Sequence, residues 1–127
     1  MKVMITGAGG FWGSRLLSFY RDKYEVWGVG HRELDFTDVS ETMKAVKRFC
    51  PDVLVHCGAV SDVGTCEKEP ERSFLVNVTG SENLAKCVLK PGQRWYCAAL
   101  IRYILGKTER MKGMQPHFFS RMERRKF

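Results

Sequence analysis

The chain has 127 residues, 44% hydrophobic and 28% charged, which is the composition of one globular domain with a single core. No run is long and apolar enough to cross a membrane, so we expect no membrane partner. The net charge of +7 comes from residues 89–127, which contain 10 Lys and Arg and 2 Asp and Glu, whereas residues 1–88 contain 11 and 12. The basic part lacks interleaved aromatic side chains on a patterned element, so we expect no nucleic-acid partner.

Residues 2–6 are predicted to form a short apolar strand that leads into a glycine-rich turn and a helix. Arg21-Asp22-Lys23 ends this helix, and a second strand is predicted over residues 24–30, followed by a loop over residues 31–37. The apolar face of the first helix comprises Trp12, Leu16, Leu17 and Tyr20.

A second helix is expected to begin after Asp38, because Glu41 follows three residues later as in a capping pair. The apolar run of residues 53–57 predicts a strand covered on both faces, as in a parallel sheet, and residues 58–62 follow as a loop. The predicted buried stripe of this helix is Val39, Met43, Val46 and Phe49.

A long helix is predicted after Glu69-Pro70-Glu71, and residues 94–100 can form a fourth strand. The residues of the long helix that are expected to face inward are Phe74, Val78, Leu84 and Val88. The alternation of strands and helices predicts an α/β fold, a Rossmann-like doubly wound parallel sheet truncated to three or four strands with flanking helices. In the strand order 3-2-1-4-5-6 the fourth strand is interior; here it would be an apolar edge, so we expect self-association through it.

The glycines of the first turn follow the spacing Gly7-x-x-Gly10-x-x-Gly13. Small residues let the backbone approach the pyrophosphate of a dinucleotide, and the free N–H groups and the dipole at the start of a helix favour negative charge. The alternative is a glycine-rich turn with no ligand, which explains less well why the turn lies between a strand and an amphipathic helix.

His31 and Arg32 are the first polar residues after the second strand. An acidic residue there would hold the ribose hydroxyls of NAD, whereas a cation suits the 2′-phosphate of NADP. NADP(H) is therefore the favoured cofactor and NAD(H) the alternative; Arg32 can equally be a solvated loop residue.

Five segments resemble the extended short-chain dehydrogenase/reductases in order and spacing, and within them the dTDP-4-dehydrorhamnose reductase (RmlD-like) family, which includes sugar-nucleotide reductases and epimerases. The resemblance covers residues 1 to about 88. The segments are Thr6-Gly7-x-x-Gly10-x-x-Gly13, Glu33-Leu34-Asp35-Phe36-Thr37-Asp38, Pro51 to Ser61, Glu67-x-Glu69-Pro70 and Asn77-Val78-x-Gly80-x-x-Asn83-Leu84-Ala85.

This resemblance implies an NAD(P)H-dependent reductase of a nucleotide-linked keto-sugar, with a nicotinamide dinucleotide and a nucleotide-sugar as its partners. It also implies cofactor-binding roles for individual residues. The residues are Phe11, Trp12 and Gly13 on the pyrophosphate, Asp35 and Phe36 beside the adenine, Ala59, Val60 and Ser61 along the nicotinamide ribose, and Asn77 on the helix behind the site.

The resemblance further implies a catalytic Ser or Thr after the next strand and a Tyr-x-x-x-Lys pair, in which the tyrosine passes its proton to the carbonyl oxygen as hydride arrives. This chain has Cys97-Ala98-Ala99 at the end of that strand. Tyr103 and Lys107 have the right spacing but follow the strand too closely and lie in no helical pattern. We interpret them as a coincidence and assign no catalytic residue.

We divide the chain into an NAD(P)-binding Rossmann-type domain, residues 1–88, and a divergent basic tail, residues 89–127, which is expected to be out of frame or poorly ordered. Reverse translation of residues 97–127 with permitted codons, read one base out of frame, can restore both family signatures in the right order. A frameshift would explain the charge jump, the lost periodicity and the missing serine together.

Three functions stay open. The first is the reductase or a fragment of one, including an epimerase or dehydratase fragment; the second is a non-catalytic NAD(P)-binding or regulatory module; the third, a nucleic-acid-binding protein, ranks last. The apolar part of the N-terminus is shorter than the core of a signal peptide, so we expect a cytoplasmic protein with reduced cysteines. The cysteines form no Cys-x-x-Cys pair, and we expect no metal site.

Overall fold

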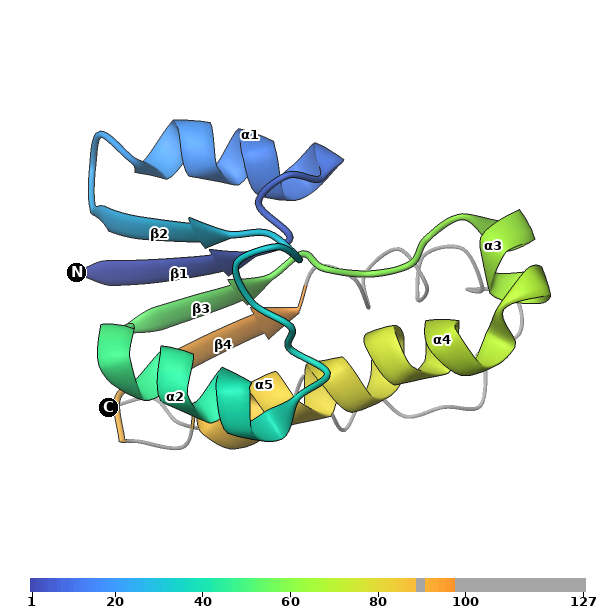
Figure 1. Ribbon diagram of the computed structural model, residues 1–127. Helices are drawn as coiled ribbons and strands as arrows, with labels where there is room; N and C mark the ends of the chain where they lie inside the picture. The colour runs from blue at the N-terminus through green and yellow to red at the C-terminus, as the bar shows by residue number, and fades with distance from the viewer. Residues whose placement is uncertain (89–90, 98–127) are drawn as a thin grey trace, which may run out of the picture.

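The computed structural model describes residues 1–88 and 91–97 (Figure 1). Strands and helices alternate along most of this length. The elements are β1 (Lys2–Thr6), α1 (Phe11–Tyr20), β2 (Glu25–Val29), α2 (Val39–Phe49), β3 (Val53–His56), α3 (Val63–Lys68), α4 (Pro70–Phe74), the π-helical segment η1 (Leu75–Gly80), α5 (Ser81–Cys87) and β4 (Arg94–Cys97).

The four strands form one parallel sheet in the order β2-β1-β3-β4. In Figure 1, α1 covers one face of this sheet, and α2 and α5 cover the other. The predicted Rossmann-like doubly wound sheet is therefore confirmed. The described part of residues 94–100 forms a strand, as predicted, and residues 98–100 lie outside the described residues.

The predicted strand order is wrong for the third strand, which pairs with β1 rather than with β2. The reason is the change of face between α1 and α2. A right-handed crossover through α1 carries the chain from β1 to β2 in one direction, and a right-handed crossover through α2 on the other face carries it back past β1. The winding therefore reverses between β1 and β3, whose carboxyl ends lie side by side.

The core lies between the sheet and the pair α2 and α5. Its buried members are Met4, Val29, Leu34, Val46, Leu54 and Leu84. The predicted stripe of α2 is only partly correct, since Val39 is 46% and Met43 41% exposed. Thr42 is buried in their place, because its hydroxyl donates to the backbone carbonyl of Asp38 at 2.6 Å and so loses no hydrogen bond on burial.

The predicted inward face of the long helix is also partly wrong. Leu84 is buried, but Phe74 is 63% and Val78 38% exposed. The prediction assumed 3.6 residues per turn, whereas η1 is π-helical, and its wider turns change the direction of Phe74 before it and of Val78 within it. Trp12, predicted on the inner face of α1, is 58% exposed.

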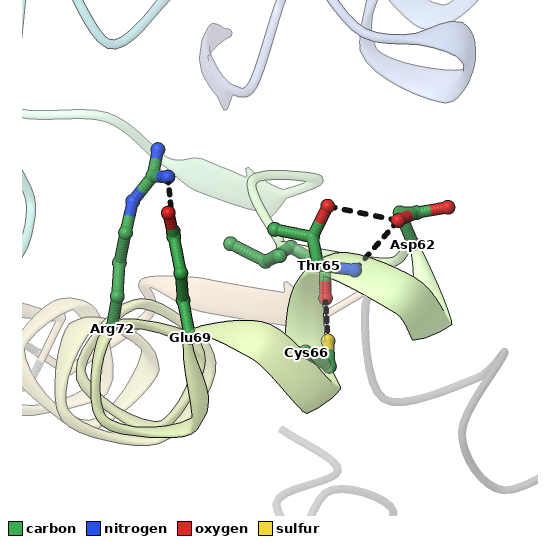
Figure 2. Close-up of polar contacts among 6 residues, drawn as sticks. Asp62, Thr65, Cys66, Glu69 and Arg72 are labelled. Atoms are coloured by element: carbon green, nitrogen blue, oxygen red, sulfur yellow. Dashed lines mark hydrogen bonds and ion pairs between the residues drawn. The ribbon is translucent and has the colours of Figure 1, made fainter.

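Helix α3 lies in a segment for which no helix was predicted. Asp62 caps it, because its Oδ2 accepts hydrogen bonds from the backbone N–H of Thr65 at 2.7 Å and from the Thr65 hydroxyl at 2.8 Å (Figure 2). These two bonds favour the ionised carboxylate and lower the pKa of Asp62. One turn later, Arg72 and Glu69 form an exposed ion pair at 2.6 Å.

Replacing Asp38 with alanine should destabilise the protein by about 1 kcal/mol, because Asp38 Oδ1 accepts the otherwise unpaired backbone N–H of Glu41 at 2.9 Å at the start of α2. The reciprocal half of the predicted capping pair is not formed, since the Glu41 carboxylate faces the N–H of Asp35 at 3.5 Å. Urea denaturation measures the effect. Asp38→Asn, which keeps the accepting oxygen, serves as the control, and equal losses for both variants would show that the cap is unimportant.

Within the described residues, no helix combines the length and the apolar character that crossing a membrane requires.

Candidate functional site

The turn after β1 lies against the loop that leaves β3. Gly7 has a φ of +68°, a conformation that side chains disfavour, and a Cβ on it would lie 2.5 Å from the backbone nitrogen of Gly58. The N–H of Ala8 donates to the carbonyl of Val29 at 3.1 Å, and the N–H of Gly10 donates to the carbonyl of Gly7 at 3.0 Å. The ends of β1, β2 and β3 therefore hold this turn in one conformation.

Helix α1 packs directly on the turn. A Cβ on Gly13 would collide with the carbonyl oxygen of Gly7, so the helix can approach this closely only with glycine there. The N-cap residue is Gly10, so no N-cap side chain accepts a hydrogen bond from the first N–H groups of the helix. Phe11 and Trp12 are 63% and 58% exposed, so their side chains leave the start of the helix open. This arrangement leaves backbone N–H groups and the positive end of the helix dipole available to an anion.

The segment after β2 is built by local hydrogen bonds. Glu33 Oε2 accepts from the N–H of Gly30 at 2.8 Å, and Asp35 Oδ1 accepts from the N–H and the hydroxyl of Thr37 at 2.9 and 2.6 Å. His31 and Arg32 are exposed at the tip of this turn. Both carboxylates are exposed and still stabilise the loop through these hydrogen bonds, and the side chains of His31 and Arg32 are exposed beside them.

Phe36 fills the space between the β3 loop and the long helix. Its ring meets the ring of His56 edge-on, with the centroids 4.9 Å apart. A Cβ on Gly58 would lie 2.7 Å from the Phe36 ring, and a Cβ on Gly80 would collide with it. The half-buried ring is therefore a wedge between these two glycines, a packing role that the resemblance to the reductases did not indicate.

The loop after β3 is held by Asn77. The side chain of Asn77 donates from Nδ2 to the carbonyl of Val60 at 2.9 Å and accepts the N–H of Val60 on Oδ1 at 2.8 Å. The thiol of Cys66 donates to the same carbonyl at 3.4 Å. Ala59 and Ser61, on either side of Val60, are exposed. Asn77 therefore determines where the predicted nicotinamide segment lies.

A second asparagine clamp fixes the loop that contains Phe36. Asn83 on α5 donates from Nδ2 to the carbonyls of Phe36 at 3.2 Å and Thr37 at 3.0 Å. The two clamps tie two separate loops to the same helical run.

Replacing Asn77 with aspartate should cost about 2 kcal/mol of stability, because a carboxylate keeps the bond from the Val60 N–H but turns its second oxygen toward the Val60 carbonyl. We expect faster amide hydrogen exchange over residues 58–62. Asn83→Asp is the matched comparison and should instead speed exchange over residues 36–38. If both variants loosen the same segment, the two clamps are not independent.

Three buried polar residues that we did not predict as site residues lie behind the turn. Thr6 Oγ1 and His56 Nδ1 are 2.6 Å apart, His56 Nε2 and Ser81 Oγ are 3.0 Å apart, and Ser81 Oγ donates to the carbonyl of Asn77 at 2.7 Å. Because the single hydroxyl proton of Ser81 goes to Asn77, we assign the ring proton to Nε2, with Nδ1 accepting from Thr6. Burial lowers the pKa of His56 from 6.5 to about 4, which keeps the ring neutral. A histidine in an apolar strand was the only sequence signal.

Burial, and secondarily the neighbouring Cys97, raises the pKa of Cys57 to about 11, so its thiol is a poor nucleophile. Tyr103 and Lys107 lie outside the described residues. Within the described ranges, no three His, Cys, Asp or Glu side chains gather as metal ligands. A pocket of about 220 Å³ between β2 and α2, lined by residues such as Trp27, Lys44 and Arg48, contains none of the predicted site residues.

The predicted site residues come from three segments: the turn at residues 7–13, the loop at residues 31–36 and the loop at residues 59–61, with Asn77 behind the last. All three segments follow the carboxyl ends of β1, β2 and β3, which meet at one edge of the parallel sheet (Figure 1). A doubly wound sheet with a glycine-rich turn at its point of reversal defines a Rossmann-like α/β domain.

The chain belongs to the family described as RmlD substrate binding domain, which matches residues 1–94. It is 39% identical over 88 residues to dTDP-4-dehydrorhamnose reductase of Mycolicibacterium smegmatis, covering 67% of this chain and 26% of that protein. It is 32% identical over 93 residues to methionine adenosyltransferase 2 subunit beta of Xenopus tropicalis, covering 67% and 28%.

Among solved structures, the fold is similar to dTDP-4-dehydrorhamnose reductase from Bacillus anthracis in complex with NADP, with a TM-score of 0.70 and 28% identity. The likeness covers 74% of this chain and 34% of that one. The chain thus spans about a third of the length of the proteins that it resembles.

Proposed function

We propose that the chain is the NADP(H)-binding part of a reductase that acts on a nucleotide-linked keto-sugar, similar to dTDP-4-dehydrorhamnose reductase. The observation that carries this proposal is the close backbone contact of Gly7 and Gly13, which seats the start of α1 directly on the turn after β1, while the exposed side chains of Phe11 and Trp12 leave the first N–H groups of the helix open to an anion. The likeness to a reductase in complex with NADP supports it.

The residues present fit a dinucleotide. The pyrophosphate would lie on the N–H groups at the start of α1, between Phe11 and Gly13, and the exposed His31 and Arg32 would face the 2′-phosphate. The loop at residues 59–61 would hold the nicotinamide ribose. When bound, NADPH would supply hydride; the described residues bind and orient it, and we assign none of them to proton transfer. The chain alone should therefore bind cofactor without turning over a nucleotide-sugar.

Titration of the purified chain with NADP⁺ and NAD⁺, followed by isothermal calorimetry, tests the proposal. We expect tighter binding of NADP⁺, and Arg32→Ala should weaken NADP⁺ binding roughly ten-fold with little effect on NAD⁺, since only NADP⁺ has the 2′-phosphate. Arg21→Ala, at the far end of α1, is the control. A folded sample that binds neither nucleotide would overturn the proposal.

A second candidate is a non-catalytic NAD(P)-binding or regulatory module, which the 32% identity to methionine adenosyltransferase 2 subunit beta favours. Hydride transfer from NADPH to a dTDP-linked keto-sugar separates the two functions. Turnover by this chain would exclude the module, whereas binding without turnover agrees both with the module and with a fragment of a reductase, epimerase or dehydratase.

We propose the cytoplasm as the compartment, because Cys57, Cys66 and Cys87 are thiols rather than disulfides. We also propose that the tail is read out of frame, because its charge and pattern differ from those of residues 1–88. The nucleotide sequence downstream of codon 88 tests this proposal, and close relatives with the same tail intact in frame would exclude it.

The protein should self-associate in size-exclusion chromatography with light scattering. Among the described residues, β4 is the last strand of the parallel sheet, and its Tyr96 is 48% exposed, so this side of the sheet presents an aromatic side chain to a second copy. Tyr96→Lys, which places a charge on this edge, should raise the monomer fraction. A clean monomer of the unmodified chain at high concentration would contradict the prediction.

A further inference from the structure

The two parts of the proposed cofactor cleft are anchored in different ways. The carboxyl end of β1, which enters the glycine-rich turn, is fixed by the sheet, since Thr6 is in register with Val29 on one side and with His56 on the other. The loop at residues 59–61 lies beyond the end of β3, and Val60 is held instead by the side chains of Asn77 and Cys66. The position of this loop therefore depends on where η1 lies relative to β1.

The junction between η1 and α5, which an i→i−3 bond closes, creates the link between these parts. In a regular α-helix, the N–H of Ser81 would donate to the carbonyl of Asn77, but here it donates to the carbonyl of Val78. The hydroxyl of Ser81 takes over the Asn77 carbonyl, and its oxygen then accepts from His56 Nε2. One side chain thus completes the helix and fastens it to β3.

His56 passes this connection to β1. Its ring is fully buried, and its two nitrogens are occupied by Thr6 and Ser81. The edge-on Phe36 ring further limits rotation of the imidazole. These hydrogen bonds form a continuous path from Thr6, through His56 and Ser81, to the backbone carbonyl of Asn77. Asn77 in turn holds Val60 in the loop at residues 59–61.

We propose that Thr6, His56 and Ser81 are positioning residues that set the separation between the glycine-rich turn and the loop at residues 59–61, and so favour the whole dinucleotide over its adenylate half. This inference rests on the proposed function, because it assumes that the pyrophosphate binds at the turn and the nicotinamide ribose at the loop. A ligand that contacts only the turn and the β2 loop should not sense the connection.

A double-mutant cycle with two probes tests the proposal. The variants are Thr6→Val, Ser81→Ala and the double variant, with Ser18→Ala on the exposed face of α1 as the control. Calorimetry measures the affinity for NADP⁺ and for adenosine 2′,5′-bisphosphate, which contains only the adenylate half. Circular dichroism and thermal unfolding verify that each variant is folded.

Each single variant should weaken NADP⁺ binding roughly ten-fold, the effect of one well-placed hydrogen bond, while the bisphosphate affinity changes by less than about two-fold. The double variant should bind NADP⁺ about as well as the weaker single variant, because either cut already frees His56. Losses of NADP⁺ affinity that multiply in the double variant, or equal losses for both probes, would overturn the positioning role of Thr6, His56 and Ser81. Either result would leave the proposed function intact. If the unmodified chain binds neither probe, the proposed function fails, and the positioning role that rests on it fails as well.

Discussion

Replacing Gly13 with alanine should abolish NADP⁺ binding and cost at least about 3 kcal/mol of stability. The new Cβ would overlap the carbonyl oxygen of Gly7, which is backbone and cannot rotate away as a side chain could. Either α1 moves off the turn or the turn changes its conformation, and both outcomes displace the N–H groups proposed to hold the pyrophosphate. Calorimetry with NADP⁺ and urea denaturation measure the two effects.

Gly9→Ala is the matched control for this variant. Gly9 lies in the same turn, but a Cβ added to it meets no atom within 4 Å. This variant should keep stability within about 0.5 kcal/mol, the usual range for a surface change. If Gly9→Ala and Gly13→Ala weaken binding equally, the turn responds to lost flexibility rather than to the collision with Gly7.

The free energy of unfolding should fall by about 3 kcal/mol as the pH is lowered from 6.5 to 4, because of His56. Its pKa is 6.5 when unfolded and about 4 when buried, so between these values the unfolded chain binds more protons than the folded one. Stability therefore rises with pH across this window, by at most about 1.4 kcal/mol per pH unit, and is fully present above pH 6.5. Urea denaturation at half-unit pH intervals measures the slope.

His56→Gln removes the titrating ring and should flatten this slope, even if it lowers stability at neutral pH. His31→Gln, on the exposed loop after β2, should retain the slope of the unmodified protein. The bonds from Thr65 lower the pKa of Asp62 from 3.8, so this carboxyl adds to the loss of stability mainly below pH 4. An unchanged slope in His56→Gln would show that other groups cause the acid sensitivity.

Local patterns were enough to predict most of the elements. The apolar runs before Gly7 and after Pro51 correspond to β1 and β3, and Asp38 caps α2 as expected. The strand order was not predictable in this way, because it depends on which face of the sheet each helix covers. The exposure of Phe74 and Val78 was missed because the π-helical turn changes the helical period, and nothing in the local sequence marks that change.

The candidate site was likewise predictable only in part. The glycine spacing and the order of the motifs indicated the segments that meet at the carboxyl edge of the sheet. The contacts of His56 with Thr6, 50 positions away, and with Ser81, 25 positions away, arise only when β1, β3 and α5 pack together. A buried polar network of this kind depends on tertiary packing. The histidine in the apolar strand is visible in the sequence, but its hydrogen-bond partners cannot be predicted from it.

The central place of β1 in the sheet affects how the domain assembles during synthesis. β1 precedes both its neighbours in the chain, and the second of them, residues 53–56, emerges from the ribosome after residues 25–29 by roughly one to five seconds at ordinary elongation rates. Throughout that interval the nascent chain can form only a two-stranded ribbon, which is marginally stable by itself. The backbone edge of Val3 to Ile5, which later pairs with β3, is uncovered during this interval.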